Sequence, residues 1–166
     1  MNVPATVYSI RMLFAEDHDR LDGLFAGFRQ RKRTDYADAK LCFREFKFGL
    51  QRHIVWEEQI LFPLFEQKTG MHDTGPTEVL RREHRLIGER LEALHDKVRQ
   101  HDPESDAEEL ALLTALEAHN LKEEQVLYPM LDRLLGDEEK QAMADAMARL
   151  PEEAYRTCCG HHGTHE

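Results

Sequence analysis

Two stretches of the chain place a histidine, and four positions later a glutamate, inside segments that otherwise look like helix interiors. They read HIVWEEQILFP at residues 53–63 and HNLKEEQVLYP at residues 119–129. Side chains four positions apart lie on the same face of an α-helix. Neutral imidazole and ionised carboxylate are the forms that bind metal ions. The two stretches therefore indicate a metal site to which two helices contribute.

The spacing between these stretches occurs a second time in the chain. His53 precedes His119 by 66 positions, and His18 precedes His84 by the same number. Many apolar positions around the histidines keep this offset, for example Pro63. Self-similarity at a fixed distance predicts a duplicated structural unit. We therefore expect a helix hairpin that occurs twice, with its two copies related by an approximate two-fold axis.

Four segments show apolar residues at every third or fourth position, which predicts four amphipathic helices with buried faces. Each of these faces carries one histidine, and two of them carry a glutamate one turn later. All of these polar side chains should meet in one layer of the core. They are His18, His53, Glu57, His84, His119 and Glu123.

Burying six such groups costs free energy unless each of them finds a partner. One histidine on an apolar face is more often a core residue with satisfied hydrogen bonds than a ligand. Four histidines on four separate faces, with glutamates at matching positions, favour a metal centre instead. A cation compensates the buried carboxylates and uses the imidazole lone pairs at the same time.

The number of ligands predicts the kind of centre. Six protein donors are too many for one tetrahedral zinc ion. The repeat predicts two ions with two histidines each, while Glu57 and Glu123 lie between the ions and bridge them. An oxo or hydroxo bridge would be the fifth donor and leave one open position on each ion. Mixed imidazole and carboxylate ligation suits iron, with manganese or zinc as substitutes.

The elements that must position these residues are long helices. Turn signals divide the chain into helices at about residues 7–31, 35–68, 76–100 and 105–135, followed by a shorter helix at 137–150. Short loops between helices of this length predict an all-α, up-down-up-down four-helix bundle. Residues 1–150 would form this single domain and residues 151–166 a flexible tail. A kink or an early stop is expected at Pro63 and Pro129.

Composition limits the classes of function. The net charge of −10 argues against a nucleic-acid or an anionic-membrane partner. No apolar run is long enough to span a membrane, and the N-terminus looks like the start of a helix rather than a signal peptide. Three cysteines in 166 residues do not make a disulfide framework, which favours a reducing, cytoplasmic location.

With these motifs, the sequence resembles the hemerythrin-like, or HHE cation-binding, family over about residues 7–135. The resemblance rests on the motifs HIVWE and HNLKE together with the two further histidines. It implies a four-helix bundle that holds a non-heme diiron centre bridged by two carboxylates. Members of the family bind O2, store or sense iron, respond to O2 or redox state, or repair iron centres damaged by nitric oxide.

The sequence departs from the oxygen carriers of that family. The carriers have a fifth histidine one turn from the ligand on the third helix, but here Leu80 and Gly88 lie one turn from His84 and neither binds metal. The second carboxylate is Glu123, four positions after His119, where the carriers use an aspartate at the fifth position. These departures argue against simple reversible O2 carriage.

Other polar residues receive weaker interpretations. The ferritin-like pattern Glu-x-x-His occurs once, at Glu92 and His95, and its repeat-related positions, Ala26 and Arg29, cannot bind metal. Three residues are considered as sources of one extra donor: His72, Glu16 and Glu83. Surface salt links or contacts that hold the ligands are expected of Glu58 and Glu124. The polar cluster of the tail, interpreted as disordered rather than as a metal site or a thiol pair, is Cys158, Cys159, His161, His162 and His165.

The resulting hypothesis is a non-heme diiron protein that binds or reacts with O2, nitric oxide or peroxide, for sensing, iron handling or iron-centre repair. Small ligands would bind beside an apolar wall of Leu21, Phe25, Ile87 and Leu91. A diiron oxidase or peroxidase-like enzyme is an alternative, although no general acid or base beyond the ligands stands out. A partner-binding helical module with a structural metal is another, with residues 137–150 as its docking face. A protein partner or a homodimer is compatible with all three.

Overall fold

The computed structural model describes residues 9–156, which contain helices and no strands. The α2, η1 and α3 segments follow one another without a loop, and so do α5, η2 and α6, so that four long helical segments and the shorter α7 result. The elements are α1 (Ile10–Arg31), α2 (Tyr36–Trp56), η1 (Glu57–Leu61), α3 (Phe62–Thr69), α4 (Pro76–Arg99), α5 (Asp106–Lys122), η2 (Glu123–Leu127), α6 (Tyr128–Leu134), α7 (Asp137–Arg149) and η3 (Glu152–Arg156).

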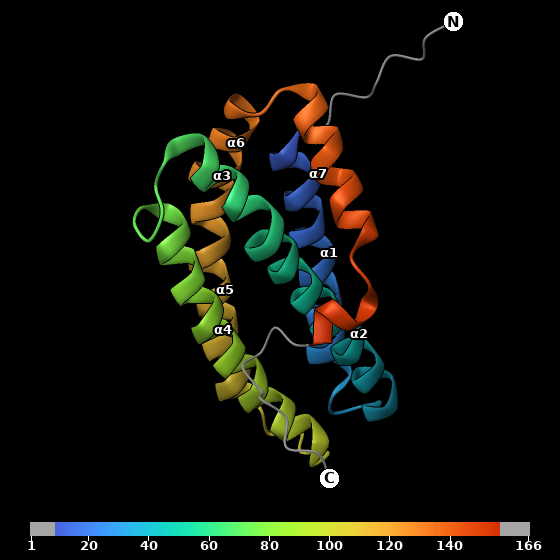
Figure 1. Ribbon diagram of the computed structural model, residues 1–166. Helices are drawn as coiled ribbons and strands as arrows, with labels where there is room; N and C mark the ends of the chain where they lie inside the picture. Colours follow the sequence, from blue (N-terminus) through green and yellow to red (C-terminus); the bar gives the residue numbers. More distant parts are fainter. Residues whose placement is uncertain (1–8, 157–166) are drawn as a thin grey trace, which may run out of the picture.

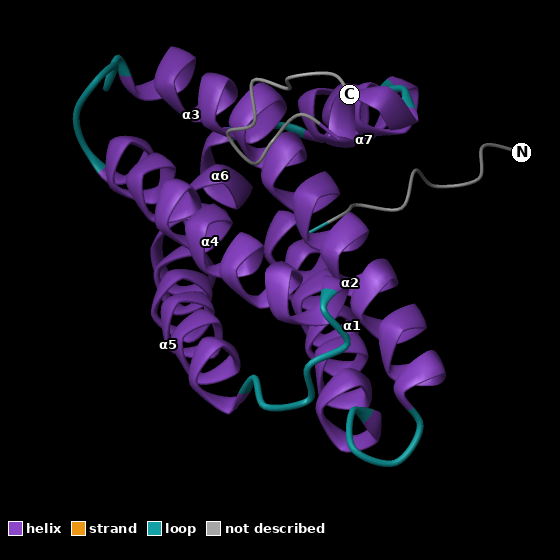
Figure 2. Ribbon diagram, turned by 90° about the horizontal axis from the view of Figure 1, so that it is seen from below, coloured by secondary structure: helices purple, strands orange, loops and turns teal. Residues whose placement is uncertain are grey.

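The four long segments form the expected bundle. Figures 1 and 2 show α1 beside α2 and α4 beside α5, and these pairs make the most extensive helix contacts in the described residues. Each pair is one hairpin of the duplicated sequence. Contacts of α1 with α6, and of α3 with α4 and α6, join the two hairpins. The predicted all-α bundle is thereby confirmed.

The helix ends follow the local chemistry of the sequence. The Asp35 side chain accepts a hydrogen bond from the backbone N–H of Asp38, which satisfies a free donor at the start of α2. Gly70 ends α3 in the left-handed conformation, with φ of 74°, which glycine adopts without steric cost. The predicted helix boundaries near residues 35 and 68 agree with the start of α2 at Tyr36 and the end of α3 at Thr69.

The two long segments that carry the glutamates each contain a π-helical turn, η1 and η2. The backbone N–H of Phe62 donates to the carbonyl of Glu57, five residues back, and that of Tyr128 donates to Glu123 in the same way. Pro63 and Pro129 follow directly and have no N–H to donate. The predicted early stop is therefore wrong: the irregularity is a widened turn before each proline, and the helices continue to Thr69 and Leu134.

The π turns change which side chains face the core. An uninterrupted α-helical pattern places Ile60 and Val126 on the stripes of the two glutamates. In the structure Val126 is 45% exposed and Ile60 is only partly buried, whereas Leu61 and Leu127 are fully buried. The predicted stripes are wrong beyond the glutamates, because each π turn inserts one additional residue and rotates the rest of the helix relative to the core.

The apolar core consists of two clusters with a polar layer between them. One cluster contains Phe25 and Phe46, and the other contains Phe14, Phe62 and Phe65. The predicted metal ligands lie between these clusters along their helices. The core on both sides of the layer is therefore closely packed, so it holds the polar residues in place and separates them from water.

The C-terminal part of the described chain covers one side of the bundle. Met143 and Met147 of α7 are buried, and Tyr155 of η3 is buried against α2, where its hydroxyl accepts a hydrogen bond of 3.3 Å from Trp56 Nε1. Residues 152–156, assigned from the sequence to the tail, thus form η3 and pack on the bundle. The tail residues interpreted above, Cys158, Cys159, His161, His162 and His165, lie outside the described residues.

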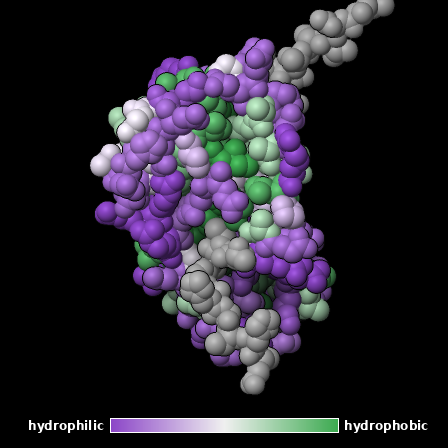
Figure 3. All heavy atoms as spheres, viewed as in Figure 1, coloured by the Kyte–Doolittle hydropathy of each residue, from purple (hydrophilic) through white to green (hydrophobic). Residues whose placement is uncertain are grey.

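The surface of the bundle is mostly polar. Figure 3 shows hydrophilic side chains over most of one face, with an apolar strip along its middle. Trp56, Ile60 and Leu64, which are partly buried against the second apolar cluster, belong to the segment that runs along this face. Among the described residues, none of the helices has the length and apolar character needed to cross a membrane.

Candidate metal centre

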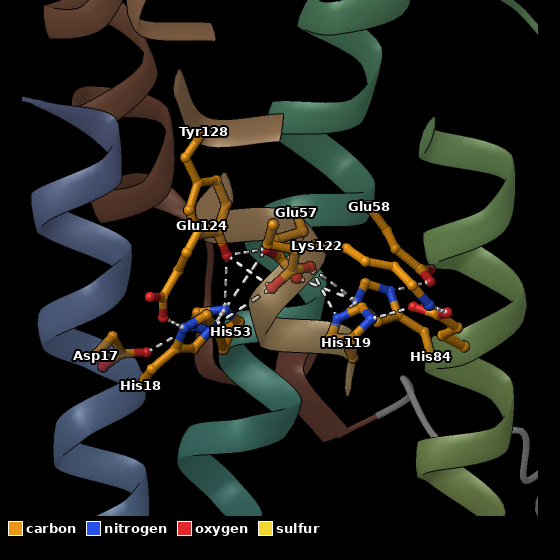
Figure 4. A network of polar contacts seen from close by, with 12 residues as sticks. Asp17, His18, His53, Glu57, Glu58, His84, His119, Lys122, Glu124 and Tyr128 are labelled. Atoms are coloured by element: carbon orange, nitrogen blue, oxygen red, sulfur yellow. Dashed lines mark hydrogen bonds and ion pairs between the residues drawn. The ribbon is translucent and has the colours of Figure 1, made fainter. Parts of the chain in front are cut away.

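The six predicted ligands meet in one layer of the bundle, as Figure 4 shows for most of them. The histidines come from α1, α2, α4 and α5, and the glutamates are the first residues of η1 and η2. The exposed fraction of each histidine is at most 5%, and that of Glu57 and Glu123 is 0%. Their donor atoms fall into two overlapping groups. One is His18, His53 and Glu123, and the other is Glu57, His84, His119 and Glu123.

The histidines are arranged as two pairs. The Nε2 atoms of His18 and His53 lie 3.1 Å apart, and those of His84 and His119 lie 3.0 Å apart. Each pair joins the two helices of one hairpin, α1 with α2 or α4 with α5. The repeat in the sequence therefore appears as two equivalent imidazole pairs in the structure.

Each glutamate lies between the two histidine pairs and directs one oxygen toward each. Glu57 Oε1 is 3.5 Å from His53 Nε2, and Glu57 Oε2 is 3.1 Å from His84 Nε2. Glu123 Oε2 is 3.4 Å from His18 Nε2, and Glu123 Oε1 is 2.8 Å from His119 Nε2. This is the placement that a carboxylate needs in order to bridge two ions.

A carboxylate also contacts the outer nitrogen, Nδ1, of every one of the four histidines. The repeat relates these carboxylates in pairs, since they come from the same positions of the two hairpins. The contacts are His18 with Glu124 at 2.6 Å, His53 with Asp17 at 2.9 Å, His84 with Glu58 at 2.8 Å and His119 with Glu83 at 3.0 Å.

These contacts at Nδ1 determine which nitrogen of each imidazole is available to bind a cation. A carboxylate that accepts the Nδ1–H fixes the ring and its tautomer, and makes Nε2 a better donor to a cation. Glu58 and Glu124 therefore hold the ligands. Glu83, considered from sequence as an extra donor, has the same supporting role. Asp17 was missed, although its offset of 66 positions from Glu83 was a signal that could have found it.

The other two candidates for an extra donor lie away from the centre. Glu16 is exposed on α1. The side chain of His72 is 66% exposed in the loop before α4, and its Nδ1 lies 4.0 Å from Glu66. The prediction of an extra donor is wrong for both residues, because neither of them faces the polar layer.

The buried carboxylates of the layer favour positive charge on the groups next to them. Burial opposes a charged imidazole, but the carboxylates of Glu57 and Asp17 outweigh it and raise the pKa of His53 to about 10. Burial likewise opposes charge on His84, whereas Glu57 and Glu58 raise its pKa to about 9. Burial acts to raise the pKa of Glu57, but the adjacent His53 and His84 hold it well below its usual value.

The donor set fits metal cations. With every Nδ1–H bound to a carboxylate, the Nε2 lone pairs of each histidine pair face each other at about 3 Å, an arrangement that repels unless a cation or a proton lies between them. In addition, the buried Oε1 of Glu123 lies 2.8 Å from His119 Nε2 but has no hydrogen bond of suitable geometry from any described residue. Buried acceptors of this kind are uncommon and call for a missing partner.

Tyr128 is a further residue of the centre that was missed in the sequence. Its buried hydroxyl lies 2.5 Å from Glu57 Oε1 and 2.9 Å from Glu123 Oε2, the two oxygens that face the His18 and His53 pair. Burial and the two carboxylates raise the pKa of Tyr128 well above its usual value, so the hydroxyl keeps its hydrogen. In the sequence, the only sign of this role is that the second stretch ends in Tyr128-Pro129, whereas the first ends in Phe62-Pro63.

The equivalent position in the other hairpin is Phe62, which has no hydroxyl. Its ring stacks on His84 with 5.5 Å between the ring centres and 11° between the ring planes. The two histidine pairs are therefore alike in their nitrogen donors and their supporting carboxylates, but only one of them has a phenol hydrogen-bonded to its glutamate oxygens.

A small cavity of about 10 Å³ adjoins the histidines, close to the size that holds one water molecule. Leu21 and Ile87 line it as predicted, and Asp22 and Asn120 add polar groups. A surface groove of about 320 Å³ between α1 and α5 shares Asp22 and Asn120 with the cavity and includes Phe25. Leu91, predicted as part of the wall, is buried within the first apolar cluster instead.

Comparisons with known proteins agree with this geometry. The family model of the Hemerythrin HHE cation binding domain matches residues 10–131. An uncharacterized hemerythrin-like protein of Schizosaccharomyces pombe is 30% identical over 135 residues, which cover 81% of this chain and 64% of the relative. The chain thus spans less than two thirds of that relative's length.

Shorter matches connect the chain to another group of proteins. The iron-sulfur cluster repair protein YtfE of Edwardsiella ictaluri is 47% identical over 45 residues, which are 27% of this chain and 20% of that protein. YtfE of Escherichia coli is 38% identical over 58 residues, 35% of this chain and 26% of that protein. No solved structure matches the chain. The family match covers nearly all of the four long helical segments, and the chain belongs to the hemerythrin-like family of HHE cation-binding domains.

Proposed function

We propose that the layer is a dinuclear metal centre and that iron is its natural metal. His18 and His53 would hold one ion, His84 and His119 the other, and Glu57 with Glu123 would bridge them. The observation that carries this proposal is the placement of the two glutamates, each of which directs one oxygen toward each histidine pair. Two imidazoles and two carboxylate oxygens for each ion suit iron, with manganese or zinc as substitutes.

The function that this centre supports best is binding of, or reaction with, O2, nitric oxide or peroxide, for sensing, iron handling or iron-centre repair. Two bound iron ions would supply exchangeable coordination positions and redox chemistry. The chain supplies four protein donors for each ion, a small adjoining cavity, and apolar clusters on both sides that exclude water. The printed name of the YtfE relatives, iron-sulfur cluster repair protein, is compatible with the repair role.

The residues near the cavity favour small and uncharged or singly charged ligands. Its volume of about 10 Å³ is close to that of one water molecule, so a diatomic molecule or azide fits once the lining moves slightly, and larger metabolites are excluded. The surface groove between α1 and α5 shares four lining residues with this cavity, His18, Asp22, Leu116 and Asn120. The reducing compartment inferred from the three cysteines belongs to the same proposal.

Elemental analysis and optical spectroscopy test this function. Protein reconstituted with iron under exclusion of air should contain close to two ions per chain. Azide should then change the visible spectrum of the oxidised protein, and nitric oxide that of the reduced protein. A reproducible metal content of one or zero would contradict the dinuclear centre. Unchanged spectra with a full metal content would instead favour a purely structural metal.

Tyr128 favours a second candidate, a peroxidase-like diiron enzyme. Its buried hydroxyl lies within hydrogen-bonding distance of both glutamates and can donate a hydrogen bond beside the proposed metal site, a group that the sequence had not indicated there. Turnover of peroxide with a reducing co-substrate, measured on the iron-loaded protein and on Tyr128→Phe, distinguishes the two candidates. Turnover that depends on Tyr128 would favour the enzyme, and binding without turnover would favour the sensor or repair protein.

A further inference from the structure

A second cavity, here called the basic groove, lies between α2 and α4, with Arg156 of η3 also lining it. Its volume is about 490 Å³, within the range of sites that bind small organic molecules. None of the six proposed metal ligands or the carboxylates that support them lines this groove. It is therefore separate from the metal centre and needs its own explanation.

The charge of the basic groove is opposite to that of the chain. Five cationic side chains and no carboxylate line it, although the chain has a net charge of −10. The cations are Lys40, Arg44, Lys47, Arg99 and Arg156.

Some of these cations are compensated by carboxylates at the rim. Lys47 pairs with Glu92 at 2.7 Å, Arg156 pairs with Glu152 at 3.0 Å, and Arg99 pairs with Asp96.

Two cations of the basic groove have no such compensation. Lys40 contacts His101, with 3.2 Å between Lys40 Nζ and the imidazole Nε2. Within residues 9–156, no carboxylate lies within ion-pair distance of Lys40 or Arg44. Both belong to α2, one turn apart, and therefore lie on the same side of that helix. Together they form a place where an anion can be held by two cationic donors.

The floor of the basic groove is apolar. Phe43 and Val98 are buried beneath it, and Phe48 is partly exposed. Leu41 lines it with 48% of its surface exposed. A ligand that covered this floor would bury apolar surface, so the groove suits a molecule with an apolar body and an anionic end.

The Glu92 and His95 pair shows that the basic groove is not a second metal site. Lys47 Nζ lies 2.6 Å from His95 Nδ1 and 2.7 Å from Glu92. The ammonium thus occupies the imidazole lone pair and the carboxylate that a metal would need, and it repels a further cation.

We propose that the basic groove binds a small organic anion. An aromatic or aliphatic body lies on Phe43, Phe48 and Leu41, and a carboxylate or phosphate group accepts hydrogen bonds from Lys40 and Arg44. Guanidinium and ammonium groups recognise both kinds of anion, so the structure assigns the shared chemistry, and the two anions are separate arms of the test. This proposal stands independently of the metal centre.

Titration calorimetry of the metal-loaded full chain tests the proposal with three probes that share one ring system. These are naphthoate, naphthyl phosphate and the neutral naphthalenemethanol. At least one of the anions should bind with one site per chain and roughly tenfold more tightly than the neutral probe. Preference for naphthoate or for naphthyl phosphate identifies the anionic group. Equal binding of all three probes, or no saturable binding of either anion, would overturn the proposal.

A second experiment measures binding of the same probes to variants in which a cation of the basic groove is neutralised or reversed in charge. Arg44→Glu should weaken binding of the preferred anion by roughly tenfold or more, and Lys40→Gln should weaken it in the same direction. The control is Arg90→Glu, an equal change of charge at an exposed position of α4 that does not line the groove. Metal content and circular dichroism should stay unchanged in all three. Equal losses in Arg44→Glu and Arg90→Glu would show a general effect of charge and reject the site.

Discussion

The two histidine pairs of the centre share their donors but differ in their surroundings. Both have imidazoles whose Nδ1–H is bound to a carboxylate, and both face the same two glutamates. Near His18 and His53, Tyr128 adds a hydroxyl, and Asn120 adds a polar group to the adjoining cavity. The repeat-related positions carry Phe62 and an isoleucine. The duplicated hairpin thus accounts for the histidines and glutamates. Substitutions between the two copies, at positions beside the ligands, make the surroundings of the two pairs different.

The two glutamates proposed as bridges, Glu57 and Glu123, give the strongest test of the equivalence of the halves. Glu57→Ala and Glu123→Ala each remove one oxygen from both histidine pairs, so we expect both variants to lose most of their bound metal. Elemental analysis after identical reconstitution measures this loss. A variant that keeps both ions, while the other variant is empty, would contradict the symmetric bridge.

The supporting carboxylates should have a smaller, matched effect. Asp17→Ala removes the Nδ1 partner of His53, and Glu83→Ala removes that of His119. Loss of such a partner lowers metal affinity by roughly 10–100-fold, and competition with a chelator measures it. Glu16→Ala, an exposed neighbour of Asp17, is the control and should bind metal normally. Unchanged affinity in both test variants would show that these contacts do not orient the ligands.

The Tyr128 hydroxyl should contribute mainly to the stability of the protein without metal. Tyr128→Phe leaves two buried carboxylate oxygens without this donor, which costs about 1–3 kcal/mol of unfolding free energy. Urea unfolding of the metal-free protein measures the cost. The matched variant Phe62→Tyr introduces a hydroxyl beside His84, where the structure shows a stacked ring. If Tyr128→Phe unfolds at the same urea concentration as the original protein, the hydroxyl does not stabilise the glutamates.

Much of the centre could be predicted because the repeat covers most of the chain, including all four long helices. The offset of 66 positions identified all four histidines and both glutamates, and helical periodicity placed them on buried faces. The contacts at Nδ1 were harder to foresee, since they join different helices. Asp17 and His53, for example, lie on α1 and α2, and no local spacing connects them.

The π turns explain why the rest could not be predicted. In a continuous α-helix, Tyr128 lies about 140° around the axis from Glu123 and would face away from the ligands. The wider turn of η2 brings Tyr128 back over that glutamate, to 2.9 Å between the hydroxyl and Oε2. The same change moves Leu61 and Leu127 into the core in place of Ile60 and Val126. Periodicity of 3.6 residues contains no sign of this change.

The polar side chain of Asn120, which replaces the Ile54 of the other hairpin, should have the smallest effect. We expect it to change only the rate of ligand binding. Asn120 lines both the small cavity and the surface groove between α1 and α5, so a ligand that enters there passes its side chain. Asn120→Leu should slow azide binding to the iron-loaded protein several-fold in stopped-flow measurements. The final spectrum and the metal content should stay the same, because Asn120 is not a proposed ligand and its carbonyl, which accepts a hydrogen bond from the backbone N–H of Glu123, is kept in the variant.

The control for this last variant lies at the repeat-related position of the other hairpin. Ile54 is buried and lines the cavity, but it does not line the groove that reaches the surface. Ile54→Leu keeps the volume and the apolar character, and the rate of azide binding should therefore stay unchanged. If Asn120→Leu binds azide as fast as the original protein, ligands enter by another route. If Ile54→Leu slows binding equally, packing around the cavity limits entry, and the polar difference between the halves has no part in it.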